Sequence, residues 1–401
     1  MGAPDEIMRN AVMPTYGRAP VSFVRGAGSW LYTAEGDAYL DFASGIAVNI
    51  FGHSHPRLVE ALTSQAGQLW HTSNLYQIPQ QEKLAYRLAQ HAKLDHTFFC
   101  NSGAEANEAA VKVARRFQYR SGHPERIKII CAGGAFHGRT LAMLAATDKE
   151  LFREGFGPMP EGFVHVPFGN LNALRDMMSD DVAAIMIEPV QGEGGARAAA
   201  EGYLDGLAAA AEEFGALIIA DEVQCGLGRT GKMFAYQHSS IQPDVVVLAK
   251  GLGGGIPIGA VIARADIGEA MGPGSHGSTF GGNPLSTACG NAVLDGLEEE
   301  GFMAGVRHRI SLLDDVVSRL KTRYPDIIIE VRGAGFLRGM RLHDDIVAGE
   351  VTAVLREQQL LIVPAADNVI RLLPPLTITE DEIAQAEAHL ITCFDSFSAS
   401  R

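Results

Sequence analysis

A lysine followed by a run of glycines is the residue around which chemistry can be built in this chain. Lys250 comes directly after the apolar residues 245–249, and glycines occupy positions 251 and 253–255. Three consecutive valines predict a short buried strand before it. Burial lowers the pKa of an ammonium group, so a lysine placed here can offer a free amine to a carbonyl. The alternative is that Lys250 merely caps the strand and extends its amine into water.

A second predicted strand ends in an acid. The apolar residues 216–220 lead into Asp221. A carboxylate in such a place must be paired or hydrogen-bonded. One suitable partner is a protonated ring nitrogen, and an acid on a pyridinium beside a lysine Schiff base is the arrangement that serves pyridoxal phosphate. The alternative for Asp221 is a helix N-cap, a frequent position for Asp after a strand.

Two polar loops after other predicted strands can bind charged or flat groups. Ser102 and Glu105 have the spacing of a capping box, and Gly103 between them lets a phosphate approach the amides of a helix start. Phe136 can stack on a flat ring, and Arg139 can bind a carboxylate. The alternatives are a plain helix cap for the first loop, and for the second a loop packed by Phe136 with Arg139 in water.

Two more loops are rich in glycine. Residues 188–195 contain Glu188 and Glu193, which suit either acid–base work or salt bridges. Residues 274–284 contain hydroxyls and glycines that suit a phosphate, with a surface turn as the alternative. His53 and His55 have no further ligands at matching spacing, so we expect a hydrogen-bonded turn there and no metal site.

The elements that position these loops alternate between strand and helix. Apolar segments without alternation predict strands buried on both faces, at 97–100, 127–131, 163–166, 183–187, 216–220, 245–248 and 259–263. Helical patterns lie between them, as at 105–119 and 203–214. The sequence therefore predicts an α/β domain with a mostly parallel central sheet and helices on both faces, where ligands bind at the carboxyl ends of the strands.

The two ends of the chain have a different pattern. A hairpin is expected within 28–42, turning near 35–37, followed by a helix over 56–70. After residue 300 the expected elements form a smaller α+β lobe: helices 302–324, 347–359 and 379–397, and strands 327–333, 336–340 and 361–363. We expect an N-terminal segment 1–60 that joins the small lobe, a large domain 61–295 that binds the cofactor, and a small domain 296–401.

Composition narrows the function classes. The chain has 401 residues and a net charge of −14, which argues against partners such as nucleic acid or an anionic membrane. No apolar run reaches membrane-spanning length, and residues 1–6 show no secretory signal. Five scattered cysteines predict reduced thiols and a cytoplasmic protein.

Five stretches together resemble the class III (ω-amino acid) aminotransferases, which have the fold type I architecture of pyridoxal-phosphate-dependent transferases. They are residues 42–48, 136–139, 188–195, 221–231 and 273–279. The resemblance covers nearly the whole chain, in order. It implies pyridoxal 5′-phosphate as cofactor and a homodimer whose active sites are shared between subunits.

The resemblance also implies roles for single residues around the cofactor. Lys250 would hold it as a Schiff base and shuttle a proton, while Asp221 would keep its ring nitrogen protonated. Gln224 would bind its phenolic oxygen. The other implied cofactor contacts are Phe136 and Val223 on the ring faces, Gly103 and Ala104 at the phosphate, and Thr279 at the phosphate of the neighbouring subunit. Many relatives have Thr or Ser where Ala104 stands, so a side-chain contact is missing here.

The implied substrate contacts are two arginines and three other residues. Arg139 would bind the substrate carboxylate distant from the reacting amine, and Arg371 the α-carboxylate of glutamate. Glu193 would pair with Arg371 when an ω-amine is bound. Ser278 and Tyr16 would contact the substrate as well.

Within the family, the stretches most resemble members that transfer the ω-amino group of N2-acetyl-L-ornithine to 2-oxoglutarate, giving N-acetyl-L-glutamate 5-semialdehyde and glutamate, a step of arginine biosynthesis. Alternatives that share the fold act on succinylornithine, ornithine or 4-aminobutyrate. A mutase or decarboxylase on the same scaffold is a further alternative, disfavoured by the Glu193–Arg371 pair. A protein that binds the cofactor without catalysis is the alternative from another class, and an intact Lys250 with Asp221 argues against it.

Overall fold

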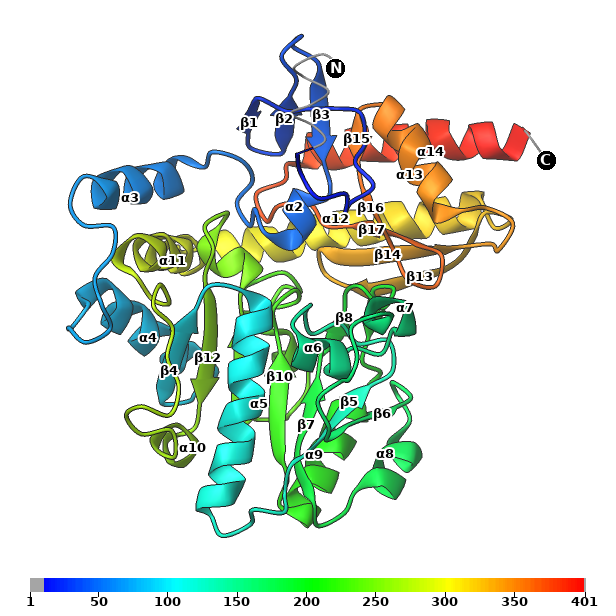
Figure 1. Cartoon of the computed structure of the whole chain (residues 1–401). Coiled ribbons are helices and arrows are strands. Elements are labelled where there is room, and N and C mark those ends of the chain that lie inside the picture. Colours follow the sequence, from blue (N-terminus) through cyan, green and yellow to red (C-terminus); the bar gives the residue numbers. More distant parts are fainter. Residues whose placement is uncertain (1–10, 400–401) are drawn as a thin grey trace.

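A seven-stranded sheet forms the centre of the molecule (Figure 1). The structure is a computed structural model, and it describes residues 11–399. The prediction for residues 1–6 lies outside this range. The strand order is β4-β12-β11-β10-β7-β5-β6. Their bounds are β4 (His96–Cys100), β5 (Lys128–Ala132), β6 (Phe163–Val166), β7 (Val182–Ile187), β10 (Leu217–Asp221), β11 (Val245–Leu248) and β12 (Gly259–Ala263). Six strands run in one direction and β12 runs antiparallel to both of its neighbours, which confirms the predicted α/β sheet.

The apolar strands are buried because helices cover both faces of this sheet. In β10, Ile219 packs in one cluster with the alanines of α5 (Gly103–Arg120), and Ile218 packs in another with Leu207 of α9 (Tyr203–Phe214). Successive strand side chains point to opposite faces, so a strand between two helix layers must be apolar throughout. Both helices were predicted from the sequence. Short elements complete this region: α6 (Leu141–Ala146), α7 (Glu150–Arg153), α8 (Leu171–Met177), α10 (Ala265–Glu269), β8 (Val190–Gln191), β9 (Arg197–Ala198), η1 (Ala235–His238) and η2 (Lys250–Gly253).

The C-terminal part forms a smaller lobe around an antiparallel sheet of order β13-β14-β17-β16. Its elements are α12 (Phe302–Arg323), β13 (Ile328–Ala334), β14 (Leu337–Leu342), α13 (Ala348–Glu357), β15 (Leu360–Leu361), β16 (Val363–Ala365), β17 (Val369–Leu372) and α14 (Glu380–Ala399). The single strand expected at 361–363 was wrong. Two strands stand there, because β15 pairs with the N-terminal segment and β16 pairs with β17.

The N-terminal segment forms the predicted hairpin. Strands β1 (Arg25–Ala27), β2 (Trp30–Tyr32) and β3 (Ala38–Asp41) are antiparallel, and β3 pairs in parallel with β15 of the C-terminal lobe. This pairing supports the predicted association of the segment with the small lobe, while the domain boundaries at residues 60 and 295 remain a prediction. The following helix α3 (Pro56–Ala66) is shorter than expected because the chain turns at Gly67.

Two long helices were not predicted from the sequence. They are α4 (Pro79–Ala92) and α11 (Pro284–Leu297). Nearly every residue of α11 is buried, and many are alanine, glycine or serine. A helix buried on all sides has no polar face, so its sequence lacks the 3.6-residue alternation that predicts amphipathic helices.

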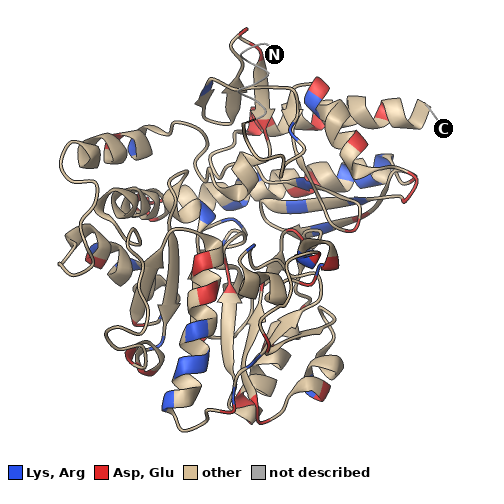
Figure 2. Ribbon diagram, viewed as in Figure 1, with Lys and Arg blue, Asp and Glu red and all other residues tan. Residues whose placement is uncertain are grey.

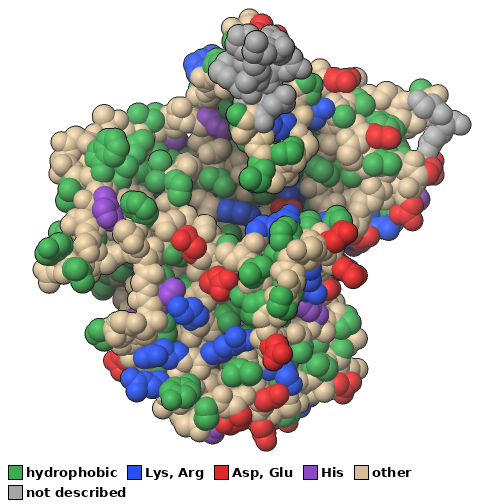
Figure 3. Space-filling view, in the orientation of Figure 1, with side chains coloured by type: hydrophobic (Ala, Val, Ile, Leu, Met, Phe, Trp, Pro, Cys, Tyr) green, Lys and Arg blue, Asp and Glu red, His purple; other side chains and the backbone are tan. Residues whose placement is uncertain are grey.

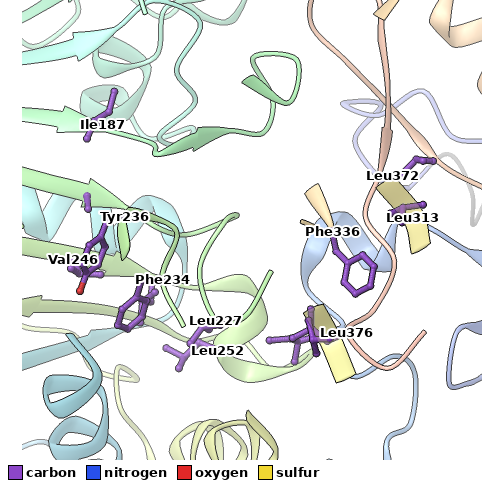
Figure 4. Close-up of a cluster of buried hydrophobic side chains, with 14 of the residues drawn as sticks. Ile187, Leu227, Phe234, Tyr236, Val246, Leu252, Leu313, Phe336, Leu372 and Leu376 are labelled. Carbon is purple, nitrogen blue, oxygen red and sulfur yellow. The ribbon is translucent and has the colours of Figure 1, made fainter. Parts of the chain in front are cut away.

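One apolar cluster joins the two lobes. Figure 4 shows it extending from Ile187 and Val246 of the large sheet to Phe336 and Leu372 of the small lobe. Buried side chains of both lobes therefore share one core, which fixes the position of the small lobe over the carboxyl ends of the large sheet. Within residues 11–399, no helix combines the length and the apolar character needed to cross a membrane.

A short turn with left-handed backbone, α2 (Ser44–Ala47), lies beside this junction. Ser44, Gly45, Ile46 and Ala47 all have φ between 48° and 65°. Non-glycine residues pay a steric cost in this conformation, so neighbouring contacts must hold it. The carboxylate of Asp41 accepts the amides of Ala43 and Ser44 and also contacts His53 Nε2 at 2.8 Å. In the described range no group of three or more His, Cys, Asp or Glu side chains is arranged to hold a metal.

Candidate active site

A cavity of about 430 Å³ lies where the parallel strands of the large sheet end. Eight residues that the sequence predicts for the site line this cavity: Gly103, Ala104, Phe136, Arg139, Asp221, Val223, Gln224 and Lys250. Figure 3 shows the surface hollowed between the two lobes, with Lys or Arg side chains in the hollow. Residues far apart in the sequence thus meet at the sheet edge where ligands bind in such folds.

Lys250 follows β11 and lies deep in the protein, with its side chain at the cavity. Burial lowers the pKa of its ammonium group, against the nearby charge of Glu193, which acts to raise it. Its backbone has φ +42°, a conformation that costs free energy in a residue with a side chain. The glycines after it make the close turn of η2, and Gly254 has φ +58°. The structure therefore favours the nucleophile over a lysine that only caps a strand.

Asp221 is the last residue of β10, next to β11 in the sheet. One carboxylate oxygen accepts the amide of Val223 at 3.0 Å, and the other contacts His137 Nδ1 at 2.7 Å and Asn107 Nδ2 at 2.8 Å. No helix begins here, so Asp221 is not a helix N-cap. Burial acts to lower the pKa of the His137 imidazole. The hydrogen bond to Asp221 and the negative charge of Asp221 outweigh burial and raise the pKa of His137 above its usual value. The carboxylate is held rigidly with its donors in place.

The N-terminus of α5 faces the same cavity. Ser102 is the N-cap, and its hydroxyl accepts the amide of Glu105 at 3.2 Å, as predicted. The amides of Gly103 and Ala104 have no acceptor within the described residues. A Cβ on Gly103 would lie 2.9 Å from Val223 Cγ1, so only glycine allows this close packing. Figure 2 shows acidic residues in the first half of α5 and basic residues in the second, which suits the helix dipole.

A buried ion pair connects the cavity to the small lobe. Arg371, in β17, is 1% exposed and its Nη2 lies 2.8 Å from Glu193 Oε1. Burial raises the pKa of Glu193, but the charges of Arg371 and Lys250 outweigh it and lower the pKa below the usual value. Arg371 Nη1 also donates to Gln224 Oε1 at 2.6 Å. The predicted pair is thus present, and Gln224 links it to the cavity.

Arg139 lines the cavity, and its guanidinium lies near two aromatic rings. Its Cζ lies 3.5 Å from the centroid of Phe152 and 5.6 Å from that of Phe136. A cation over an aromatic face is stabilised by the ring. Among residues 11–399 no carboxylate forms an ion pair with Arg139, so the guanidinium can accept one from a substrate.

Besides Glu193 and Arg371, which Gln224 links to the cavity, three predicted residues do not line it. Thr279 is exposed, and Ser278 accepts hydrogen bonds from Asn101 Nδ2 and from the amide of Gly281. Tyr16 is 76% exposed. One chain alone therefore leaves these three outside the residues that line the cavity.

Two buried polar residues of the site, Asn107 and His137, were given no role from the sequence, and both hold Asp221. Glu188, for which acid–base work or a salt bridge was expected, accepts the amide of Phe136 at 3.0 Å. Burial raises the pKa of Glu188 to about 7. Asn107 lies one helical turn after Gly103, a spacing that could have placed it at the same helix end.

The cavity fits the parts of pyridoxal phosphate. Free amides at a helix start suit its phosphate, Asp221 suits a protonated ring nitrogen, and Lys250 suits its aldehyde. Two buried atoms of cavity residues, Asn107 Oδ1 and His137 Nε2, have no partner in the described structure. The residues of one chain therefore fit this group, apart from the hydroxyl that Ala104 lacks and from Thr279, which lies outside the cavity.

The chain is similar along its length to known aminotransferases. The class III aminotransferase family model matches residues 12–394. An acetylornithine aminotransferase of Agrobacterium fabrum is 50% identical over 387 residues, covering 96% of each chain. Among solved structures, an ornithine aminotransferase of Toxoplasma gondii has a TM-score of 0.93 at 32% identity, over 100% of this chain and 97% of that one. An N-acetylornithine aminotransferase of Stenotrophomonas maltophilia has a TM-score of 0.84 at 36% identity, over 96% and 98%.

The match extends over nearly the whole chain, and four of the five stretches that carry the earlier resemblance contribute residues to one cavity. The chain belongs to the class III aminotransferases, a family of pyridoxal-phosphate-dependent enzymes.

Proposed function

We propose that this enzyme uses pyridoxal phosphate to move the ω-amino group of N2-acetyl-L-ornithine to 2-oxoglutarate, giving N-acetyl-L-glutamate 5-semialdehyde and L-glutamate. The observation that carries the proposal is a single cavity lined by Lys250, Asp221 and Gln224, in which Gln224 accepts a hydrogen bond from Arg371 of the Arg371–Glu193 pair. Relatives at 50% identity that bear the name acetylornithine aminotransferase support the substrate.

Several residues hold the cofactor in this proposal. Bound pyridoxal phosphate supplies an aldehyde for the amine and a ring that accepts electrons. Lys250 would hold the aldehyde carbon, and Asp221 would keep the proton on the ring nitrogen. The amides of Gly103 and Ala104 would bind the phosphate. Val223 and Phe136 would pack against the ring, and Gln224 would donate to the phenolic oxygen.

Lys250 also moves the proton in the reaction. With a substrate amine in its place on the aldehyde, Lys250 would have its Nζ available as a base. Its lowered pKa keeps a fraction of this group neutral, so it can take a proton from the carbon that bears the substrate amine. The buried surroundings keep water from competing.

Glu193 and Arg371 let one site accept two substrates. An ω-amine substrate has no carboxylate next to its reacting carbon, and Glu193 neutralises Arg371 in that case. With glutamate, the α-carboxylate replaces Glu193 on Arg371. Arg139 binds the distant carboxylate of either substrate. We also place Ser278 and Tyr16 at the substrate, from the partner loop and from the N-terminal segment.

Replacing Gly192 by Ala tests the link between the ion pair and the cavity. A Cβ at position 192 would overlap the side-chain amide of Gln224 and push it from Arg371. Because a hydrogen bond to a charged group is worth ~1.5–3 kcal/mol, we expect kcat/KM for glutamate to fall roughly 10-fold or more. Gly349→Ala is the control, since a Cβ there has only a contact at 4.0 Å. Equal kcat/KM values for the two variants would contradict the role of Gln224.

A substrate panel tests the proposed donor. We expect kcat/KM for N2-acetylornithine to exceed those for ornithine and 4-aminobutyrate by about 10-fold or more, since an unfilled or unpaired subsite costs ~1–3 kcal/mol. Ornithine transfer is the second candidate, favoured by the fold similarity to the Toxoplasma gondii enzyme. A higher kcat/KM for ornithine would reject the acetylornithine assignment and leave the family unchanged.

We propose that a second copy of the chain completes the site. Exposed apolar side chains gather around the loop that carries Thr279: Leu69, Trp70, Leu75, Tyr76 and Phe280. Asn74 Nδ2 ties this surface to the loop by bonds to the carbonyls of Ser278 and Gly281. Covering the surface with a partner brings Thr279 to the partner's phosphate. Sedimentation should show a dimer for the wild type and a smaller species for Leu75→Glu; a monomeric active wild type would reject this.

We also propose a cytoplasmic location. All five cysteines are free and buried, as in a reducing compartment. Cell fractionation checks this, and recovery of the enzyme from a secreted fraction would reject it.

A further inference from the structure

The left-handed turn of α2 lies against the active-site cavity, although none of the steps above uses it. Val48, the residue that follows the turn, lines the cavity together with Lys250. Ala47, the last residue of the turn, is buried in one cluster with Val190 of β8. The shape of this turn therefore sets part of the wall beside the reactive lysine.

The residues after the turn pack on the glycines that follow Lys250. A Cβ at Gly251 would lie 3.2 Å from Ile50 Cδ1, and one at Gly255 would lie 3.4 Å from Asn49 Oδ1. Ile50 thus fills the space that a side chain at position 251 would need. Because the interior is closely packed, a displacement of Asn49 or Ile50 shifts the backbone that carries the lysine.

Both ends of this segment are held by the small lobe. The carbonyl of Phe42 accepts the amide of Leu373 at 2.6 Å, and the carbonyl of Ile50 accepts the amide of Leu376 at 2.7 Å. A change in the shape of the turn must therefore be taken up within 43–49, which includes the residues at the cavity wall and at the glycines.

One carboxylate holds the turn in its shape. Asp41 is 2% exposed, and its Oδ1 accepts the amides of Ala43 and Ser44, each at 2.9 Å. Its Oδ2 lies 2.8 Å from Nε2 of His53, whose backbone amide and carbonyl both pair with Gly28. Left-handed backbone costs free energy at each residue that has a side chain, so without the carboxylate the turn would relax.

We propose that Asp41 and His53 are positioning residues that set the place of Lys250 through the left-handed turn; this rests on the proposed role of Lys250. His53 anchors the carboxylate, and the carboxylate fixes the turn. The turn in turn holds Asn49 and Ile50 on the glycines after the lysine. Neither Asp41 nor His53 lines the cavity, so both act through the turn.

Asp41→Ala in the holoenzyme tests this role, at a temperature at which circular dichroism shows every variant to be folded. We expect the saturating rate of each half-reaction to fall roughly 10- to 100-fold, since a small misplacement of a reacting group has effects of this size. The KM values for acetylornithine and glutamate should change by less than about threefold, because the arginines that we place at the substrate carboxylates are untouched.

Two further variants separate the hydrogen bonds from the charge. In Asp41→Asn the amide oxygen can still accept from Ala43 and Ser44, and the nitrogen can donate to His53, so we expect rates within about threefold of the wild type. His53→Ala removes only the anchor, and we expect a fall of about three- to 10-fold. The double variant Asp41→Ala/His53→Ala should be no slower than Asp41→Ala, because the two residues act as one unit.

Glu382→Ala is the matched control. Glu382, in α14, also binds the N-terminal segment, since it accepts from Ser29 Oγ at 3.0 Å and from Trp30 Nε1 at 2.8 Å. It does not line the cavity and has no contact with the turn through these bonds. The variant should lose thermal stability and keep the saturating rates of the wild type.

Any of three results would overturn the proposal. They are saturating rates of Asp41→Ala equal to those of Glu382→Ala, a fall that Asp41→Asn does not relieve, and, where Asp41→Ala does not fold, wild-type rates for His53→Ala. The glutamate half-reaction reports all three whichever ω-amine is the preferred donor. A wild type that reacts with glutamate but not with acetylornithine would instead remove the proposed function and leave the positioning role to be decided on glutamate.

Discussion

Lys250→Ala should abolish transamination while the fold survives. We expect kcat/KM to fall by at least ~10³-fold, because both the covalent attachment and the proton transfer are lost. Thermal stability of the cofactor-free protein should stay equal or rise. The substitution removes a buried amine whose pKa burial already lowers, so no favourable charge interaction outweighing its desolvation is lost.

The measurement combines activity, visible absorbance and borohydride reduction. The wild type should be yellow with pyridoxal phosphate and should yield a reduced adduct on Lys250, and the variant should not. Lys250→Arg is the matched variant, since it keeps a cation but cannot bond the aldehyde. Full activity of Lys250→Arg would show that charge rather than the nucleophile matters, and a wild type that stays colourless would reject the whole assignment.

Asp221→Asn should give the second largest loss. Both carboxylate oxygens accept hydrogen bonds, from Val223 on one side and from Asn107 and His137 on the other. An amide nitrogen in either position faces a donor. We expect a loss of stability of ~1–3 kcal/mol and a fall in kcat on the order of 10²–10³, because the negative charge that holds the ring proton is gone.

A titration distinguishes this role from a structural one. Asp221 raises the pKa of His137, so the variant should lower that pKa toward or below its usual value. Asp244→Asn is the control: Asp244 accepts the amide of Ile218 at 2.8 Å and pairs with Arg264, at the opposite end of β11. It should lose stability and keep kcat. A comparable fall in kcat for both variants would mean that Asp221 acts only through folding.

The central sheet was predictable because its strands are apolar on both faces. Residues 163–166, 245–248 and 259–263 coincide with β6, β11 and β12, and the other four strands of the sheet differ by one residue at one or both ends. The prediction failed where contacts between distant segments determine the secondary structure. The segment around 361–363 splits into β15 and β16 because two different partners take it, and no local pattern encodes a partner.

The left-handed backbone of the turn at Ser44–Ala47 was also not predicted from the sequence. Local preference opposes this backbone for Ile46 and Ala47, and only the Asp41 carboxylate and the packing around it hold the conformation.

Some residues of the candidate site could be predicted from the sequence, and others only from the fold. Motifs around Lys250, Asp221 and Arg139 predicted which residue types do chemistry, since each stands directly after a strand and the strand ends converge at one sheet edge. Asn107 and His137 gained a role only when the fold placed both within hydrogen-bond distance of Asp221.

The sequence alone determined the class of fold and the family and singled out Lys250 as the candidate nucleophile, because residue type and spacing encode strand burial and motif chemistry. The tertiary structure decided how the charges are paired. Arg371 and Glu193 meet across 178 positions of sequence. Such contacts depend on long-range packing, which no local pattern of residues specifies.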